Sequence, residues 1–447
     1  MFPYLIIFAH FHMAFRLPEL DSLAVLEEVN LVYDKNAYSD DHPFFIVQLP
    51  SDEDARKLAR RSILIKDVIR LYADEPTLER VLETARNTPD LIGPYANSTF
   101  RFDCRAFGST VEHADQVARI EQFAFLPAGA VRLKNPDVIF FYMEDYGTLH
   151  TRGREPPAEP LRCMFGVWVA SGDRQLVNKY DLKKRGYLGT TSMDAELSLV
   201  MANQALVRAG SFVLDPFVGT GSFLITCAHY GAFTMGADID GRQIRGKGGK
   251  SIDSNAVQYN LTGRVLDTVV CDIAHHPWRK GEFWDAIVCD PPYGVRAGAR
   301  KLGKGPKSKV PPGPLAPIKP NGEQRYPQTV PYELDDVLVD LIAFAAEKLV
   351  PGGRLVYWLP TVTDEYTHAD VPMHPRFRLV ANSNQVFGTW CRRLITMEKL
   401  REGEQAEEVG TAKGDGAPQA PAHAKFREVY FAPGRGSQPS TPPSERA

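Results

Sequence analysis

The strongest structural signal in the chain is the run Ser211-Phe-Val-Leu-Asp215-Pro216-Phe217-Val-Gly219-Thr220-Gly221-Ser222. The apolar residues 212–214 predict a short buried strand, which must end at Asp215-Pro216 because proline cannot donate to a sheet ladder. Gly219 and Gly221 permit a tight turn, and the apolar residues after Ser222 predict a helix. A strand, a glycine turn and a helix in this order indicate an open α/β sheet with a ligand held at the strand ends.

Acidic residues follow at the ends of the next two predicted strands. Gly236-Ala-Asp238-Ile239-Asp240 closes one of them and Val269-Val-Cys271-Asp272-Ile273 closes the other. The first acid is positioned to accept hydrogen bonds from a ribose diol, and the second can meet an adenine amine. Taken alone, each acid is more simply a turn or cap residue, and a lone Gly-x-Gly is weak support for a cofactor. The chain has no Gly-Lys-Ser/Thr after the turn, which disfavours a triphosphate site.

A second motif, Asp290-Pro291-Pro292-Tyr293-Gly294, follows the apolar run Ala286–Cys289, which predicts a buried parallel strand. The prolines stop this strand and present a carboxylate and an aromatic ring at its C-terminal end. An acid beside an aromatic face suits a flat base with an amino group, since the acid accepts the amine's hydrogen bonds and the ring stacks on the base. The alternative is a turn that only ends a strand, and the glycine turn upstream weighs against it.

Length and composition limit the number of domains and the classes of protein that the chain can belong to. With 447 residues and a hydrophobic content of 44%, the chain is long enough for two or three domains with sizeable cores. A net charge of −3 excludes a globally basic nucleic-acid coat, so any RNA contact must come from local basic patches. The six scattered cysteines form no C-x-x-C pair, which disfavours a zinc site and a disulfide framework. The apolar start Met1–Ala9 is too short for a membrane span, and we expect a soluble, cytoplasmic protein.

Residues 1–150 alternate strand-like and helix-like runs, as in α+β domains, and carry no cofactor signature. Ser98–Gly108 alternates as a strand does, and Val131–Tyr142 predicts a strand, a turn and another strand. From residues alone, a substrate-positioning module and an interaction domain are equally compatible with this half.

The second half contains further elements around the two motifs. Ala195–Ala209 predicts a helix capped by Thr191 or Ser192. The basic, proline-rich stretch Gly298–Pro331 cannot form a packed element, so it is either a flap that holds RNA phosphates or a tolerated loop insertion. Beyond residue 402 the composition predicts a largely disordered tail with a small apolar patch at Phe426–Phe431.

The glycine turn, the two acids and Asp-Pro-Pro-Tyr, in this order, resemble the class I S-adenosylmethionine-dependent methyltransferases that methylate exocyclic amines. Together with Tyr187–Asp194 and Cys391–Met397, the motifs resemble the eukaryotic tRNA guanosine-10 N2-methyltransferases over roughly residues 1–400. The strand Phe100–Gly108 and the turn Lys134–Asp137 resemble the THUMP domain, which a ferredoxin-like domain usually precedes. Asp-Pro-Pro-Tyr alone is shared with DNA and protein amine methyltransferases, which stay an alternative, as does a catalytically silent RNA-binding subunit.

The resemblance implies an α/β fold in which a Rossmann-like class I methyltransferase sheet follows an α+β ferredoxin-like and THUMP region. The expected segments are a ferredoxin-like domain at 1–65, a THUMP-like RNA-binding domain at 66–150, a linker at 151–182, a methyltransferase domain at 183–401 with its insertion at 298–331, and a mostly disordered tail at 402–447. The resemblance also implies S-adenosylmethionine as cofactor, tRNA as substrate and a small zinc-containing activator subunit as partner. Since the chain shows no zinc ligands of its own, we assign no metal site to it.

The expected site residues fall into three groups. The target base, flipped out of its helix, is expected to contact Asp290, Pro291, Pro292 and Tyr293. The cofactor is expected to contact Asp215, Pro216, Phe217, Gly219, Thr220, Gly221, Asp238, Ile239, Asp272 and Ile273. The candidate RNA contacts are Arg101, Arg105, Arg132, Arg296, Arg300 and Lys301. For each of the first three, a solvated charge on an exposed sheet face is an equal alternative, and for Arg300 and Lys301 the alternative is the tolerated loop insertion.

Overall fold

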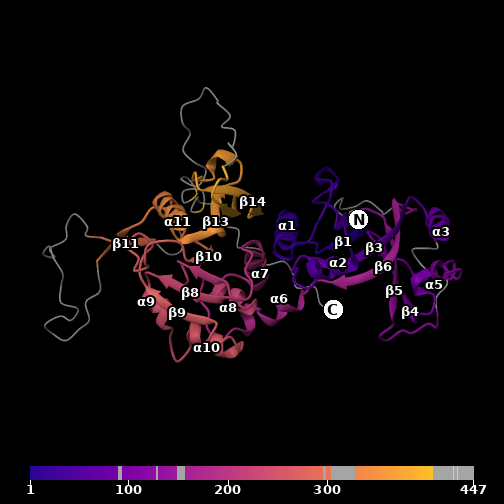
Figure 1. Cartoon of the computed structure of the whole chain (residues 1–447), viewed down its shortest axis with the longest axis horizontal. Helices are drawn as coiled ribbons and strands as arrows, with labels where there is room; N and C mark the ends of the chain where they lie inside the picture. Colours follow the sequence, from indigo (N-terminus) through magenta and orange to yellow (C-terminus); the bar gives the residue numbers. More distant parts are fainter. Residues whose placement is uncertain are drawn as a thin grey trace, which may run out of the picture. The chain divides into compact units, whose positions relative to one another are not determined.

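The computed structural model describes residues 1–88, 93–126, 129–147, 157–294, 299–303 and 328–405, together with Phe426 and Tyr430. The chain divides into two compact units, Met1–Gln175 and Leu176–Ala447 (Figure 1). Within the described residues, every helix is too short or too polar to cross a membrane.

The N-terminal unit is built on one six-stranded sheet with the strand order β2-β1-β3-β6-β5-β4. Its strands are β1 (Phe2–Phe8), β2 (Phe44–Leu49), β3 (Ile65–Glu75), β4 (Phe100–Phe107), β5 (Val138–Asp145) and β6 (Arg162–Ser171). Only β4 and β5 run parallel; the other neighbours pair antiparallel. The two regions expected as separate small domains therefore share one sheet. Strand β6, inside the range expected as a linker, pairs with both β3 and β5, and the domain boundaries stay a prediction.

Helices cover this sheet where the sequence provides caps and apolar faces. They are α1 (Arg16–Leu26), α2 (Asp52–Ala59), α3 (Leu78–Arg86) and α5 (His113–Glu121), with short 3-10 turns η1 (Met13–Phe15), η2 (Lys35–Ala37) and η3 (Gly93–Tyr95). Ser51 and Thr77 cap α2 and α3 by accepting backbone hydrogen bonds. The strand expected just after Val131 is wrong: Val131 forms a single bridge to Phe100, because Asn135 (φ 48°) and Pro136 turn the chain directly into β5.

The second unit contains a seven-stranded sheet with the order β14-β15-β13-β10-β7-β8-β9. Its strands are β7 (Phe212–Asp215), β8 (Phe233–Asp238), β9 (Val265–Val270), β10 (Trp284–Cys289), β13 (Leu349–Val362), β14 (Phe377–Val386) and β15 (Trp390–Lys399). From β9 to β13 the strands are parallel, and β15 runs antiparallel to both of its neighbours. The predicted Rossmann-like sheet is confirmed. Because the strand order reverses between β7 and β10, their carboxyl ends border the crevice where such sheets bind ligands.

The helices of this unit are α6 (Gln175–Lys179), α7 (Ala195–Gln204), α8 (Ser222–His229), α9 (Gly241–Arg245), α10 (Ile252–Gln258) and α11 (Leu334–Lys348), with the 3-10 turns η4 (Leu182–Lys184) and η5 (His368–Asp370). The expected cap of α7 is wrong. Asp194 itself caps the helix by accepting from the Leu197 N–H at 2.9 Å, while the Ser192 hydroxyl is engaged with Thr220.

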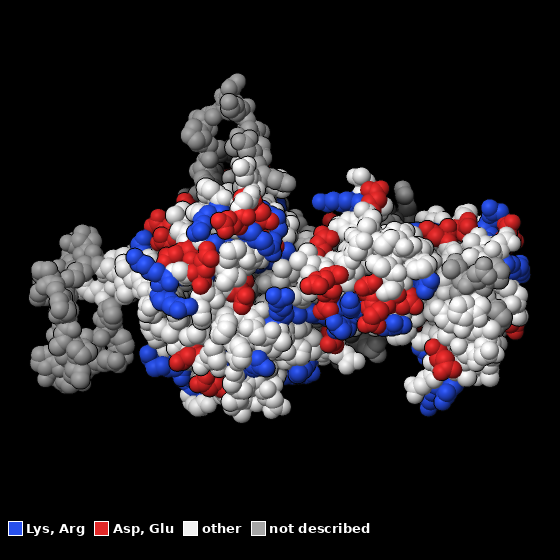
Figure 2. Space-filling view, viewed as in Figure 1, with Lys and Arg blue, Asp and Glu red and all other residues white. Residues whose placement is uncertain are grey.

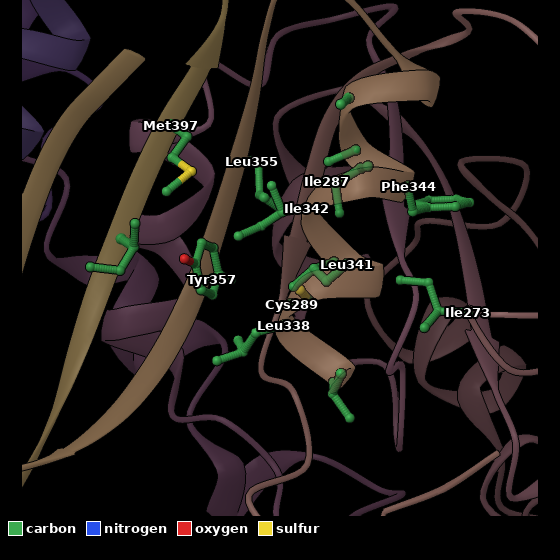
Figure 3. Close-up of a cluster of buried hydrophobic side chains, with 14 of the residues drawn as sticks. Ile273, Ile287, Cys289, Leu338, Leu341, Ile342, Phe344, Leu355, Tyr357 and Met397 are labelled. Carbon is green, nitrogen blue, oxygen red and sulfur yellow. The ribbon is translucent and has the colours of Figure 1, made fainter. Parts of the chain in front are cut away.

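A core between α11 and the sheet fixes the strands that carry the second motif. Leu338, Leu341 and Ile342 on α11 face Leu355 and Tyr357 of β13, with Met397 of β15 and Cys289 of β10 alongside (Figure 3). Each fully buried aliphatic side chain contributes about 1.5–3 kcal/mol. The C-terminal end of β10 is therefore held on a rigid base.

The basic stretch Gly298–Pro331 was expected to form no packed element, and the structure differs from this expectation at both of its ends. Strand β11 (Arg300–Leu302) pairs antiparallel with β12 (Thr329–Pro331), and the flanking Ala299 and Tyr332 are buried in the same core as α11. The expectation that this stretch cannot form a packed element is wrong there, because its apolar flanks anchor a short hairpin stem. Residues 304–327 lie outside the described part of the chain.

Candidate active site

The glycine turn joins β7 to α8 in a conformation that favours glycine. Gly219 and Gly221 have φ values of 49° and 79°, and Gly221 is the residue that precedes the first turn of α8. Gly236 on the neighbouring β8 is needed for a different reason: a Cβ there would lie 2.5 Å from the Val218 side chain. Val218 in turn hydrogen-bonds from its N–H to the Ala237 carbonyl, so the turn lies directly against β8.

Two strand-end acids hold this turn in place. Asp215 is buried and accepts a hydrogen bond from the Phe217 N–H at 3.0 Å. Asp238 accepts from the Gly219 N–H at 2.9 Å and from the Asp240 N–H at 2.8 Å. Burial raises the pKa of Asp238 and raises that of Asp215 well above its usual value, against the backbone hydrogen bonds that each acid accepts.

The third acid, Asp272, follows β9 and is only 4% exposed. Its Oδ1 accepts from the His275 N–H at 2.6 Å and its Oδ2 from the Leu302 N–H at 2.5 Å. Asp272 thereby ties the stem of the insertion to the carboxyl edge of the sheet. Ile273, next to it, packs in the core with α11.

The geometry of these residues fits an adenosine-type cofactor. A Cβ built at Gly219 would meet nothing within 4 Å, so the space beside the turn is open. A carboxylate oxygen has two acceptor sites, and each oxygen of Asp238 accepts from one backbone N–H, so Asp238 can accept further hydrogen bonds. The oxygens of Asp272 also lie 3.1 Å and 3.3 Å from His275 Nδ1, in addition to their backbone partners. Pro216, Phe217, Thr220 and Ile239 lie in the turn or at the end of β8, as the sequence predicts.

Asp290 follows β10 directly, and β10 pairs with β7 in the register Ile287↔Leu214. The second motif and the glycine turn thus leave the sheet at adjacent strands. Asp290 and Tyr293 are partly buried, and the Tyr293 hydroxyl donates to Asp290 Oδ1. Burial raises the pKa of Asp290, while the Arg392 guanidinium and the hydrogen bond from Tyr293 oppose that rise. Pro291 is buried beneath the motif, and Pro292 is half-buried.

Three further side chains lie at this site that the sequence analysis did not assign to it. Arg392 of β15 is close enough to Asp290 and Tyr293 to affect the pKa of both. Trp390 begins the same strand, and Phe426 contacts the rings of Trp390 and Tyr293. Arg392 belongs to the motif Cys391–Met397, and Trp390 precedes it. Their place beside the second motif depends on how β15 pairs in the sheet, which local sequence does not reveal.

The candidate RNA contacts differ in their exposure and in their ion pairs. Arg105 forms ion pairs with Asp67 at 2.8 Å and with Asp103 at 2.6 Å, and Arg101 is half-buried. Arg132 is exposed. Arg300 donates to the Thr329 carbonyl at 2.7 Å, Lys301 lies 3.3 Å from Asp336, and Arg296 falls outside the described residues. On the face drawn in Figure 2, basic and acidic side chains are interspersed.

The sheet order, the glycine turn with its acids and the Asp-Pro-Pro-Tyr motif at the switch point define a class I methyltransferase of the kind that acts on amines. Family models match both units: the Tmrp11 THUMP N-terminal domain over residues 2–174 and the RMKL-like methyltransferase domain over residues 183–304.

Whole-chain comparisons point to one family. The chain is 38% identical to "tRNA (guanine(10)-N(2))-methyltransferase TRMT11" of Homo sapiens, over 96% of this chain and 95% of that protein. It is also 38% identical to "tRNA (guanine(10)-N(2))-methyltransferase" of Schizosaccharomyces pombe, over 96% of each. The chain belongs to the tRNA (guanine(10)-N(2))-methyltransferase family. Among solved structures, TrmN from Thermus thermophilus is 18% identical over 89% of this chain and 100% of its own, with a TM-score of 0.42.

Proposed function

We propose that the chain transfers a methyl group from S-adenosylmethionine to the exocyclic N2 amine of guanosine 10 in tRNA. The observation that carries this proposal is that two strand ends are neighbours: the glycine turn follows β7 and Asp290 follows β10, and these strands pair in parallel, so that the charge of Asp290 acts on buried Asp215. Membership of the tRNA (guanine(10)-N(2))-methyltransferase family supports the choice of substrate and position.

The chain's own residues account for binding of the cofactor. Backbone N–H groups at the start of α8 suit the cofactor's carboxylate, and the opening beside Gly219 admits it. Asp238 is positioned for the ribose hydroxyls and Asp272 for the adenine amine. When bound, S-adenosylmethionine supplies an electrophilic methyl group on its sulfonium.

The second motif positions the amine. A guanine N2 amine is a weak nucleophile, since its lone pair is delocalised into the ring. Asp290 and the Pro291 carbonyl accept its two N–H hydrogens, which directs the lone pair toward the methyl group, and the Tyr293 ring restricts the base by stacking. Asp290 also stabilises the positive charge that develops on nitrogen and can accept the proton. Because Tyr293 donates to one Asp290 oxygen, the amine binds the remaining acceptor sites of the carboxylate.

The proposed partner is the small zinc-containing activator subunit. Strand β9 is an edge of the sheet and exposes Leu266 and Val270, at 45% and 52%. An apolar edge strand with an unpaired ladder is a template for strand addition by another chain, and natural proteins rarely leave one uncovered. The zinc is placed in that subunit by the family resemblance alone. The cytoplasmic location expected from the sequence stays a prediction.

Methyl transfer from radiolabelled S-adenosylmethionine to tRNA, DNA and protein tests the proposed function, with nucleosides identified after digestion. We expect N2-methylguanosine at position 10 of tRNA, and no transfer when that nucleotide is inosine, which lacks the N2 amine. Asp290→Asn should abolish transfer while S-adenosylhomocysteine still binds. Transfer to DNA or protein alone, or near-normal turnover by Asp290→Asn, would overturn the assignment.

Co-purification with the purified activator subunit tests the partner. Leu266→Lys should abolish the complex because it places a charge in the expected strand-addition site. Val339→Lys on α11 is the matched control, since Val339 is 63% exposed on a different element. Equal binding by both variants would exclude β9 as the interface.

A further inference from the structure

Four aromatic side chains gather at the mouth of the second motif, and two of them come from beyond the methyltransferase sheet. The last strand of that sheet ends at Lys399, yet the Phe426 ring lies 5.9 Å from the Tyr293 ring, with the two planes at 88°. Phe426 is also 5.3 Å from Trp390 and 5.7 Å from Tyr430, which itself lies 5.7 Å from Trp390.

Phe426 is a packed component of this cluster. It is 1% exposed, whereas Asp290 and Tyr293 remain partly exposed beside it. Phe426 and Tyr293 adopt the edge-to-face geometry that aromatic pairs favour.

The cluster constrains the one ring that must stack on the target base. Tyr293 is held at its hydroxyl by Asp290 and at its ring by Phe426. Trp390 and Tyr430 also contact the Phe426 ring. The family match also includes Phe426, since a match over 96% of 447 residues must extend past residue 425.

We propose that Phe426 is a positioning residue for the methylation of guanosine. It forms a wall of the base pocket and fixes the Tyr293 ring at the angle at which that ring stacks on the flipped base. The inference rests on the proposed function and deepens it, because it assigns to Phe426 a part in holding the substrate. A purine presents a larger face than a pyrimidine, so a ring wall of this kind favours a purine target.

Steady-state kinetics of full-length variants test the proposal. Phe426→Ala should lower kcat for tRNA methylation by about ten-fold, in line with the loss of an aromatic contact that orients the base. The KM for tRNA and the affinity for S-adenosylhomocysteine by calorimetry should stay near the wild-type values. Phe426→Tyr, which keeps the ring, should restore kcat.

Phe283→Ala is a control for the loss of an aromatic ring away from the second motif. Phe283 contacts two aromatic rings, Phe212 at 5.2 Å and Trp284 at 4.9 Å, at the opposite end of β10 from Asp290. Phe283 is 36% exposed and Phe426 is 1% exposed, so Phe283→Ala should lose less thermal stability than Phe426→Ala and leave kcat unchanged. An unchanged kcat in Phe426→Ala would overturn the proposal, and a raised kcat would show that Phe426 blocks the base site instead. If the wild-type protein itself fails to methylate tRNA, the proposed function fails, and that result is distinct from either of these.

Discussion

Asp290 works under two opposing influences at the end of β10. Burial favours its neutral form, whereas Arg392 and the Tyr293 hydroxyl favour the carboxylate. The proposed chemistry needs the carboxylate, because a protonated acid has lost one of the acceptor sites that the amine requires. Arg392 therefore keeps Asp290 in its active form over a wider pH range than burial alone would permit.

We predict an acid limb in the pH profile of kcat/KM. Since the pKa of Asp290 is raised, activity falls as the pH drops through a midpoint above the ordinary aspartate value of 3.8. Arg392→Gln removes a charge that favours the carboxylate, so the midpoint should move to higher pH. Arg393→Gln is the control, because Arg393 points to the other face of β15, over Tyr366. A limb that does not move in Arg392→Gln would contradict this role.

Asp238 joins the glycine turn to β8 and is the expected ribose acceptor. We predict that Asp238→Ala weakens S-adenosylhomocysteine binding by about ten- to a hundred-fold, the effect of losing hydrogen bonds to a charged group. Asp240→Ala is the matched control: Asp240 caps α9 and pairs with exposed Arg242, and its loss should leave affinity nearly unchanged. Calorimetry measures both, and equal affinities in the two variants would remove Asp238 from the ribose site.

At the scale of elements, the contact between the glycine turn and β8 leaves no room for a side chain. We predict that Gly236→Ala displaces Val218 and lowers the free energy of unfolding by about 1–3 kcal/mol, as overpacking does. Cofactor affinity should fall with it, because the turn shifts. Gly93→Ala, where a Cβ meets nothing within 4 Å, should be neutral. Denaturant unfolding measures the free energy of unfolding of both variants. An unchanged value in Gly236→Ala would show that the glycine turn can shift to accommodate the added methyl group.

The elements that the sequence predicted best are those with local signals. The strand ends at Asp215, Asp238 and Asp290 are marked by acids, glycines or prolines, so their positions along the chain were predictable. Sheet partners were not: β6 completes the N-terminal sheet by pairing with β3, a contact across about ninety residues of sequence. The position of Phe426 could not be predicted either, because the rings that it contacts, Tyr293 and Trp390, are distant from it in the sequence.

For the whole molecule, we propose that the N-terminal unit binds RNA, and its candidate arginines differ in environment. Arg132 is exposed, whereas the charge of Arg105 is compensated by Asp67 and Asp103. We predict that Arg132→Gln weakens tRNA binding and reduces the slope of log affinity against log salt by about one. Filter binding at several salt concentrations measures this slope.

Arg105→Gln serves as the comparison. It should leave the salt slope unchanged and lower the free energy of unfolding by about 1–3 kcal/mol, because buried Asp67 loses its ion pair. If Arg105→Gln reduces the slope and Arg132→Gln does not, the roles of the two residues are reversed.

The central claim is that one crevice holds the target guanine and the methyl donor side by side, between Asp290 and the glycine turn. The most direct measurement is calorimetry with a single conjugate in which guanine N2 is linked through a methylene to an adenosyl group that mimics the cofactor. We predict that the wild-type protein binds this conjugate more tightly than S-adenosylhomocysteine, and that Asp290→Asn and Asp238→Ala each weaken its binding. Undiminished binding of the conjugate by Asp290→Asn would contradict the account.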